Sequence, residues 1–176
     1  NNAPKSHAED IDNSYLGAVL NLVEEYEFVN TSTPGQKSLV QTMENGTYKF
    51  YDSADAPFKD RDPRLWGTII YPNAEFKSIP VVLQAGQLVK KGNDWAIEVG
   101  DLDSKDANGN LITSLNGPKE SNEQYINKTG FYVRKFLDET PSSGTRGRGS
   151  EMWMPRFRMS EAYMIAAEAS YELNNG

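Results

Sequence analysis

The sequence supplies few of the side chains that catalysis requires. Its only histidine, His7, lies in a polar N-terminal stretch, so a serine–histidine–aspartate arrangement would lack a base held in a folded core. The 25 acidic side chains show no spacing that singles out a carboxylate pair for glycoside cleavage. We therefore expect a protein that binds its ligand without chemistry. A glycoside hydrolase or an associated domain is the alternative from the enzyme class.

An oxygen-rich run in the middle of the chain has side chains that suit calcium: Asp101, Asp103, Asp106, Asn108 and Asn110. A calcium loop begun at Asp106 would need a later glycine than Gly109 and a glutamate at its twelfth position, which the sequence lacks. A solvated hairpin loop is the favoured interpretation. The absence of cysteine excludes disulfides and thiolate metal ligands. We expect neither a metal nor a cofactor.

Sugar recognition requires different side chains. The C–H face of a pyranose packs on an aromatic ring, while planar polar side chains meet its hydroxyl groups. Trp95 is the strongest candidate because it follows Asn93 and Asp94 in a segment typical of an exposed loop. Weaker candidates lie in the same irregular part of the chain, at Tyr48, Tyr51, Phe76 and Tyr125. The alternative is that Trp95 anchors its loop to the core, as we expect of Trp66 and Trp153.

Composition limits the possible partners. The formal net charge of −7 repels a phosphate backbone, so we expect no nucleic acid ligand. The chain lacks a run of about 18 apolar residues, which a membrane-spanning helix needs. Apolar residues make up 38 % of the chain, below the globular average, and 14 glycines and nine prolines accompany them. These values favour a loop-rich α+β fold with short strands and long irregular loops.

Apolar spacing predicts the elements of the first quarter of the chain. An amphipathic helix of about three turns is expected from Ile11 onward, with an apolar face formed by Tyr15, Leu16, Val19, Leu20 and Val23. Residues 36–44 predict a short helix or a turn, which ends at the turn signal Asn45-Gly46. Thr47–Tyr51 alternates as a short strand does.

The rest of the body alternates short strands with irregular segments. Pro63 suits the first turn of a helix, with Asp62 as its cap. β-branched and aromatic residues then predict short strands, at Thr68–Tyr71, Val81–Leu83, Trp95–Val99 and Thr129–Phe136. Residues 138–150, rich in glycine, serine and arginine, predict a loop that leads to the last helix.

The last helix, at about residues 156–173, has one face of small and apolar residues. The spacing that defines this face is that of Ala162, Ile165, Ala166, Ala169 and Leu173. Its alanines permit the close approach of another helix. Because a helix this short is marginal alone, we expect a partner helix outside this segment. The 176 residues are then part of a longer protein.

Four motifs, in this order along the chain, resemble those of one family. They are L-V-E-E-Y at Leu22–Tyr26, R-D-P-R-L at Arg61–Leu65, T-G-F-Y-V-R-K-F at Thr129–Phe136, and a helical motif at Arg158–Ala169. Together they resemble the SusD/RagB group of surface lipoproteins of Bacteroidetes, which bind nutrients. The resemblance covers roughly residues 20–170.

The resemblance implies that the chain is the C-terminal part of a SusD-like domain. It implies an irregular ligand-presenting region at 27–150 and a scaffold helix at about 156–173, which belongs to a set of tetratricopeptide-like helices. It further implies a location on the cell-surface side of the outer membrane, with a lipid anchor outside this segment. The implied ligand is a glycan, passed without catalysis to a SusC-like TonB-dependent transporter. Peptide capture, as in the RagB branch, and a purely structural surface protein are the other readings.

Charged residues of the shared motifs are expected to be structural rather than to contact ligand. This group comprises Arg61, Asp62, Arg64, Arg158, Glu161 and Glu168. Arg61 and Arg64 flank the carboxylate of Asp62, so an ion-paired turn is expected there. Either Arg156 or Arg158 is expected to reach Glu161 or a backbone carbonyl. None of the candidate stacking residues lies in these motifs. Their prediction as ligand-binding residues therefore depends on aromatic chemistry and not on the resemblance.

Overall fold

The computed structural model describes residues 3–4, 16–29, 39–119, 126–141, 143, 150, 152–153 and 155–175. Its α-helices within those ranges are α1 (Leu20–Glu24), α2 (Arg64–Thr68) and α3 (Met159–Asn175), and a 3-10 turn spans Ala56–Phe58. The strands there are short: β1 (Met43–Glu44), β2 (Thr47–Tyr48), β3 (Ile69–Ile70), β4 (Glu75–Phe76), β5 (Ile79–Pro80), β6 (Gln87–Lys91), β7 (Asp94–Glu98), β8 (Ser104–Lys105), β9 (Leu111–Thr113) and β10 (Tyr132–Val133).

This mixture of helices, short strands and irregular connections agrees with the predicted loop-rich α+β class. The tetratricopeptide-like arrangement of helices stays a prediction. Of the helices in the described part of the chain, none combines the length and the apolar character that crossing a membrane requires.

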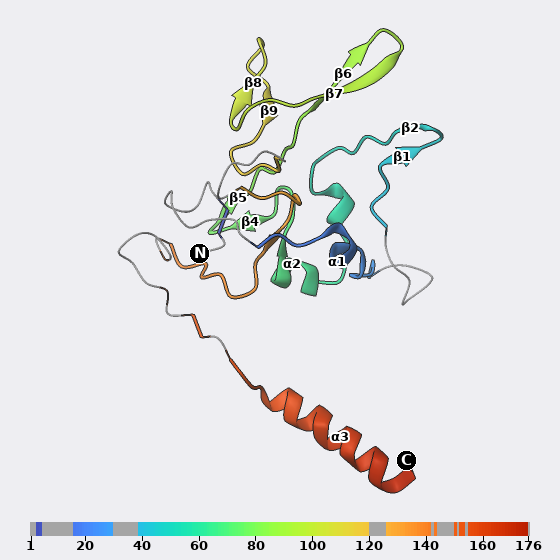
Figure 1. Ribbon diagram of the computed structural model, residues 1–176, viewed down its shortest axis with the longest axis vertical. Helices are drawn as coiled ribbons and strands as arrows, with labels where there is room; N and C mark the ends of the chain where they lie inside the picture. Colours follow the sequence, from blue (N-terminus) through green and yellow to red (C-terminus); the bar gives the residue numbers. More distant parts are fainter. Residues whose placement is uncertain are drawn as a thin grey trace.

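The pair β3–β10 joins distant parts of the chain and organises the body. Ile70 lies opposite Tyr132, and Ile69 lies opposite Val133. Gly17 adds an isolated antiparallel bridge to Tyr132. The other strand pairs in the described ranges are hairpins of consecutive strands, and Figure 1 shows β1–β2, β6–β7 and β8–β9 at the periphery. The central pair therefore carries the long-range topology.

The two residues of β3 divide the core into two clusters. Successive residues of a strand point to opposite faces, so Ile69 and Ile70 pack on different sides. Ile70 belongs to a buried cluster with Phe76 and Tyr132, and Ile69 belongs to a second cluster with Leu65. Burying a side chain of this size contributes about 1.5–3 kcal/mol. One short strand pair is thus stabilised from both faces.

The helix predicted from Ile11 onward is shorter than expected. Helix α1 begins at Leu20, and residues 11–15 lie outside the described part. The segment before α1 is not helical because it runs beside β10: the Ala18 N–H donates to the Phe131 carbonyl at 3.1 Å, and Gly17 bridges to β10. Three residues of the predicted apolar face are consequently exposed, Leu16, Val19 and Leu20.

The segment predicted as a short helix or turn at 36–44 contains strand β1 instead, and residues 36–38 lie outside the described part. The turn signal after it is confirmed: Asn45 has φ 50° and Gly46 has φ 78°, the positive values that a two-residue hairpin turn needs. Strand β2 covers only the first two residues of the predicted strand Thr47–Tyr51.

Hydrogen bonds from side chains shorten another predicted strand. Of Thr129–Phe136, only the two residues of β10 are a strand. Before them, Asn127 Oδ1 accepts from the Thr129 N–H at 2.8 Å and the Gly130 N–H at 2.7 Å. Its Nδ2 donates to the Phe131 carbonyl at 2.6 Å. An amide side chain therefore takes the place of a neighbouring strand.

Two of the three remaining predicted strands are present close to their predicted positions. Strand β3 lies within the predicted Thr68–Tyr71, and β7 begins one residue before the predicted Trp95–Val99. The predicted strand Val81–Leu83 is not a strand. Val81 nevertheless donates to the Ala74 carbonyl at 3.0 Å and accepts from the Asn73 N–H at 2.9 Å, which prolongs the β4–β5 hairpin.

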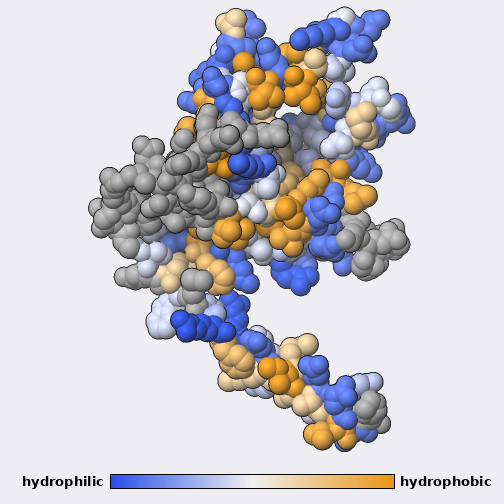
Figure 2. Space-filling model, viewed as in Figure 1, coloured by the Kyte–Doolittle hydropathy of each residue, from blue (hydrophilic) through white to orange (hydrophobic). Residues whose placement is uncertain are grey.

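The predicted C-terminal helix is present as α3, which stands apart from the body (Figure 1). From residue 159 to residue 174 every side chain except Ala162 is exposed. Figure 2 shows apolar and polar groups mixed along the visible side of this helix. The predicted small and apolar face is therefore open to solvent in this structure, and the partner helix stays a prediction.

Arg61 holds the end of α1 against the rest of the body. Only 5 % of this residue is exposed. Its Nε donates to the Pro57 carbonyl at 3.2 Å and its Nη1 to the Tyr26 carbonyl at 3.0 Å, and its guanidinium lies 4.4 Å from the centre of the Phe28 ring. Burial lowers the pKa of Arg61, because desolvation penalises the charged form.

Arg64 behaves differently, although it belongs to the same motif. It is exposed, and its guanidinium pairs with the Asp62 carboxylate at 2.5 Å. Asp62 Oδ1 also accepts the Arg64 N–H at 2.8 Å, although the residue at the N-cap of α2 is Pro63. The predicted ion-paired turn is correct for Arg64 and wrong for Arg61, whose described hydrogen bonds go to carbonyls.

Replacing Arg61 by alanine should lower the free energy of unfolding by about 2–4 kcal/mol, because it opens a cavity and leaves buried carbonyls without a donor. Urea denaturation followed by circular dichroism measures the change. Arg64→Ala is the matched control and should stay close to the unchanged protein, because an exposed ion pair contributes little. Equal losses for the two variants would contradict the assignment of Arg61 as the structural arginine.

Candidate functional site

The β6–β7 hairpin presents the strongest predicted stacking residue, Trp95. Two residues, Gly92 and Asn93, connect the strands, and Gly92 has the positive φ of 66° that such a turn favours. Trp95 therefore lies on strand β7 rather than in a loop, directly opposite Lys90. Asn93 and Asp94 are exposed at the tip of the hairpin, as predicted.

The register of the hairpin separates its side chains onto two faces. Residues opposite each other, and residues two apart, point to the same face. One face therefore carries Trp95 and Ile97 with their partners Lys90 and Leu88. The other face carries both carboxylates, Asp94 and Glu98, with their partners Lys91 and Gln87 and the apolar pair Val89–Ala96 between them.

Phe50 meets Trp95 from the segment that follows the β1–β2 hairpin. The ring centres lie 5.4 Å apart with an angle of 56° between the planes. Phe50 is 63 % exposed and Trp95 is 40 % exposed, so both rings lie at the surface and the interpretation of Trp95 as a core anchor is wrong. We call these two rings the aromatic platform. Sequence reasoning missed Phe50, because its pairing with Trp95 depends on the tertiary arrangement of two separate segments.

The other predicted stacking residues lie elsewhere. Tyr51 is partly exposed, but its hydroxyl donates to the Gln41 carbonyl at 2.8 Å and Lys49 Nζ lies 5.4 Å from its ring centre. Phe76 is only 1 % exposed; its place among the ligand-binding candidates is wrong, because the core cluster of Ile70 encloses its ring. Tyr125 lies outside the described residues. Tyr48 is half-buried on β2.

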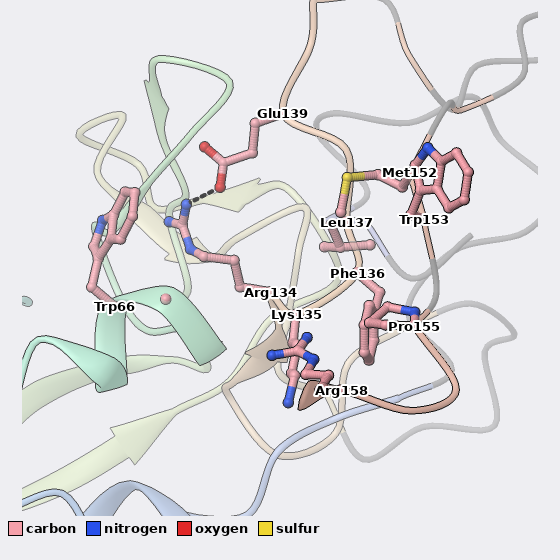
Figure 3. Close-up of a pocket in the computed structure, with 11 residues that line it drawn as sticks. Trp66, Arg134, Lys135, Phe136, Leu137, Glu139, Met152, Trp153, Pro155 and Arg158 are labelled. Carbon is pink, nitrogen blue, oxygen red and sulfur yellow. Dashed lines mark hydrogen bonds and ion pairs between the residues drawn. The ribbon is translucent and has the colours of Figure 1, made fainter. Parts of the chain in front are cut away.

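A cleft of about 440 Å³ lies where residues of two family-like motifs meet the residue that directly follows a third. Trp66 follows the Arg61–Leu65 motif, Arg134 belongs to the motif around β10, and Arg158 begins the helical motif (Figure 3). Trp66 is 50 % exposed and Trp153, also at this cleft, is 88 % exposed. The prediction that both tryptophans lie in the core is wrong.

Arg134 is the buried centre of this cleft, with 3 % of the residue exposed. Its guanidinium lies 4.2 Å from the centre of the Trp66 ring. It pairs with the Glu139 carboxylate and donates to the Glu75 carbonyl, and Figure 3 shows Arg134 between Trp66 and Glu139. These contacts tie α2, β4 and the segment after β10 together, which is a structural role.

The charged residues of the helical motif, Arg158 just before α3 and two glutamates within it, do not make the predicted side-chain contact. Arg158, Glu161 and Glu168 make no ion pair with another residue in the part of the chain described here. The Arg158–Glu161 contact is a backbone one, since the Glu161 N–H donates to the Arg158 carbonyl at 3.0 Å. Both residues are exposed, and Arg158 lines the cleft instead of pairing with Glu161.

The oxygen-rich run forms the β8–β9 hairpin and its turn. Asp106 Oδ1 accepts the N–H groups of Asn108 and Asn110, each at 2.8 Å. The side-chain hydrogen bond from Asn110 is the main cause that lowers the pKa of Asp106. The carboxylate is thus used to close the loop, as the hairpin interpretation predicts. No group of three potential metal ligands occurs among the residues whose placement is described.

Comparison with known proteins identifies a family. The family model described as the SusD family matches residues 10–176, which confirms the resemblance drawn from the four motifs. No curated protein and no solved structure matches the chain.

The loop beside the cleft generates a prediction for acid pH. Asp138 Oδ1 accepts the Thr140 N–H at 2.9 Å and its Oδ2 accepts from the Ser150 hydroxyl at 2.8 Å. These hydrogen bonds lower the pKa of Asp138 to about 2, and the one from the Thr140 backbone N–H has the largest effect. Because this value lies below about 3.9 for an unfolded aspartate, the contribution to stability is complete above about pH 4 and is lost as the pH falls through about 2.

An NMR titration of the side-chain carboxyl carbon should therefore give Asp138 a midpoint of about 2. Asp138→Asn should remove this part of the acid dependence of unfolding and leave the remainder. A midpoint for Asp138 near the ordinary aspartate value would contradict the hydrogen-bonded loop.

Proposed function

The chain belongs to the SusD family, and we propose that it captures a glycan at the bacterial surface and passes it to a SusC-like TonB-dependent transporter. Members of this family are generally non-catalytic, surface-associated binding proteins of the outer membrane. The glycan, the transporter and a lipid anchor outside this segment are parts of the proposal. The observation that carries it is the exposed pair of rings, Phe50 and Trp95.

The aromatic platform suits a sugar for a physical reason. Two tilted rings that are both exposed offer apolar area to the C–H face of a pyranose, while the hydroxyl groups at its edge stay available for polar partners. Asn93 lies at the tip of the same hairpin and supplies an amide there, whereas the predicted partner Asp94 points to the other face of the hairpin. Such a site binds by contact alone and holds each sugar weakly, so repeated units of a polymer increase retention.

Peptide capture is a second candidate, and one observation favours it. Ile97 and Val99 continue the apolar row beyond Trp95 and are both exposed, and aliphatic side chains suit an apolar peptide better than a sugar. A glycan remains the better match. The two rings of the platform suit the C–H face of a sugar, and the polar tip of the hairpin suits its hydroxyl groups.

Trp95→Ala and Phe50→Ala should each weaken retention of the protein on affinity gels about tenfold, a change of about 1.4 kcal/mol. The gels contain plant, host or microbial polysaccharides. Because both rings are exposed, the circular dichroism spectra should not change. Trp153→Ala is the matched control, since it removes an exposed tryptophan at the cleft, and it should migrate as the unchanged protein does.

The other outcomes identify the alternatives. Loss of retention in Trp153→Ala with full retention in Trp95→Ala would place binding in the cleft and reject the platform. New reducing ends in the incubated polysaccharide would indicate a glycoside hydrolase. Retention by a library of apolar peptides and by no polysaccharide would favour peptide capture.

A further inference from the structure

We propose that Lys90 makes the aromatic platform selective for acidic sugars, so that the ligand is a glycan with a carboxylate on the stacked unit, such as a polymer of uronic acids. The proposal rests on the proposed function and deepens it. Its basis is the juxtaposition of a lysine and the stacking tryptophan at one register position of the β6–β7 hairpin.

The register places a cation beside the ring. Lys90 lies directly opposite Trp95, and side chains at such positions share a face with Cβ atoms about 4.5–5.5 Å apart. The flexible four-carbon stem of lysine is long enough to bring its ammonium group to the edge of a sugar that lies on the indole.

The same register removes carboxylates from this face. Asp94 and Glu98 point to the opposite face of the hairpin, where Glu98 accepts a hydrogen bond from Gln87 Nε2 at 2.9 Å and Asp94 lies opposite Lys91. The platform face of the hairpin therefore carries a single positive charge, in a protein with a formal net charge of −7.

Lys90 has its charge free for a ligand. The residue is exposed, and no carboxylate within the described ranges forms an ion pair with it. An acidic protein repels a polyanion at long range, so binding of an acidic glycan depends on such a local cation. A charge-assisted hydrogen bond from Lys90 supplies the attraction at the stacked sugar.

The geometry of a uronic acid fits this arrangement. Its carboxylate is attached to the ring carbon C5 and extends from the edge of the pyranose, while the C–H face stays free to pack on an aromatic ring. A sugar stacked on Trp95 thus directs its carboxylate sideways, toward the positions that a cross-strand lysine reaches. A neutral hexose on the same ring has a hydroxymethyl group there and gains only a neutral hydrogen bond.

The test compares acidic polymers with their own neutral forms. The probes are polygalacturonate, alginate and hyaluronan, each beside the same polymer with its carboxyl groups chemically reduced. Affinity gels are run with the unchanged protein, Lys90→Gln, and Lys91→Gln, which removes a lysine of the other face. We expect at least one acidic polymer to retain the unchanged protein about fivefold or more above its reduced form. Lys90→Gln should abolish this preference and Lys91→Gln should keep it.

Each contrary result has a distinct meaning. Equal losses in Lys90→Gln and Lys91→Gln would overturn the proposal in favour of general charge attraction. Retention on reduced or neutral polymers equal to that on every acidic one would overturn acid selectivity and leave glycan capture intact. Retention unaffected by Trp95→Ala would reject the platform itself, and with it both proposals.

Discussion

The pairing of β3 with β10 is the constraint on which the rest of the structure depends. The two strands are about 60 residues apart in the chain, so closing this loop costs conformational entropy that local contacts cannot recover. The cost is offset from both faces of the pair, since Ile69 and Ile70 are each fully buried in a different cluster. Each peripheral hairpin then needs only local contacts to form.

Two buried arginines extend this central pair to the segments around it. Arg61 reaches back to the end of α1 and to the 3-10 turn through backbone carbonyls. Arg134 leaves the end of β10 and joins β4, α2 and Glu139. Both guanidinium groups combine several donors with a planar face that packs on a ring, which is why a lysine would not replace either of them. Family-like motifs that contain such buried arginines therefore indicate a shared fold more directly than a shared ligand.

Local signals in the sequence predicted local structure well. The Asn45-Gly46 turn and helix α3 depend on short-range propensity, and both are present where expected. The failures share a cause in tertiary contacts. Gly17 lies within a helical pattern but pairs with β10. Phe76 is buried and Trp66 is exposed for reasons that no local sequence pattern contains. Phe50 was missed in the same way, since only the arrangement of two separate segments makes it a neighbour of Trp95.

The contrast between Trp66 and Trp95 favours Trp95 as the ring on which a sugar would stack. The Trp66 ring is already engaged by the Arg134 guanidinium at 4.2 Å, and that cation is held in turn by Glu139 and the Glu75 carbonyl. A sugar on that face would have to displace a buried charge, which is costly once its partners are left unpaired. The ring contact described for Trp95 is with the tilted ring of Phe50, which is itself largely exposed. A ligand there replaces water over an apolar surface, with no buried contact to break. On the proposed binding mode, a ligand would enter and leave the hairpin without disturbing the strand pair that holds the fold.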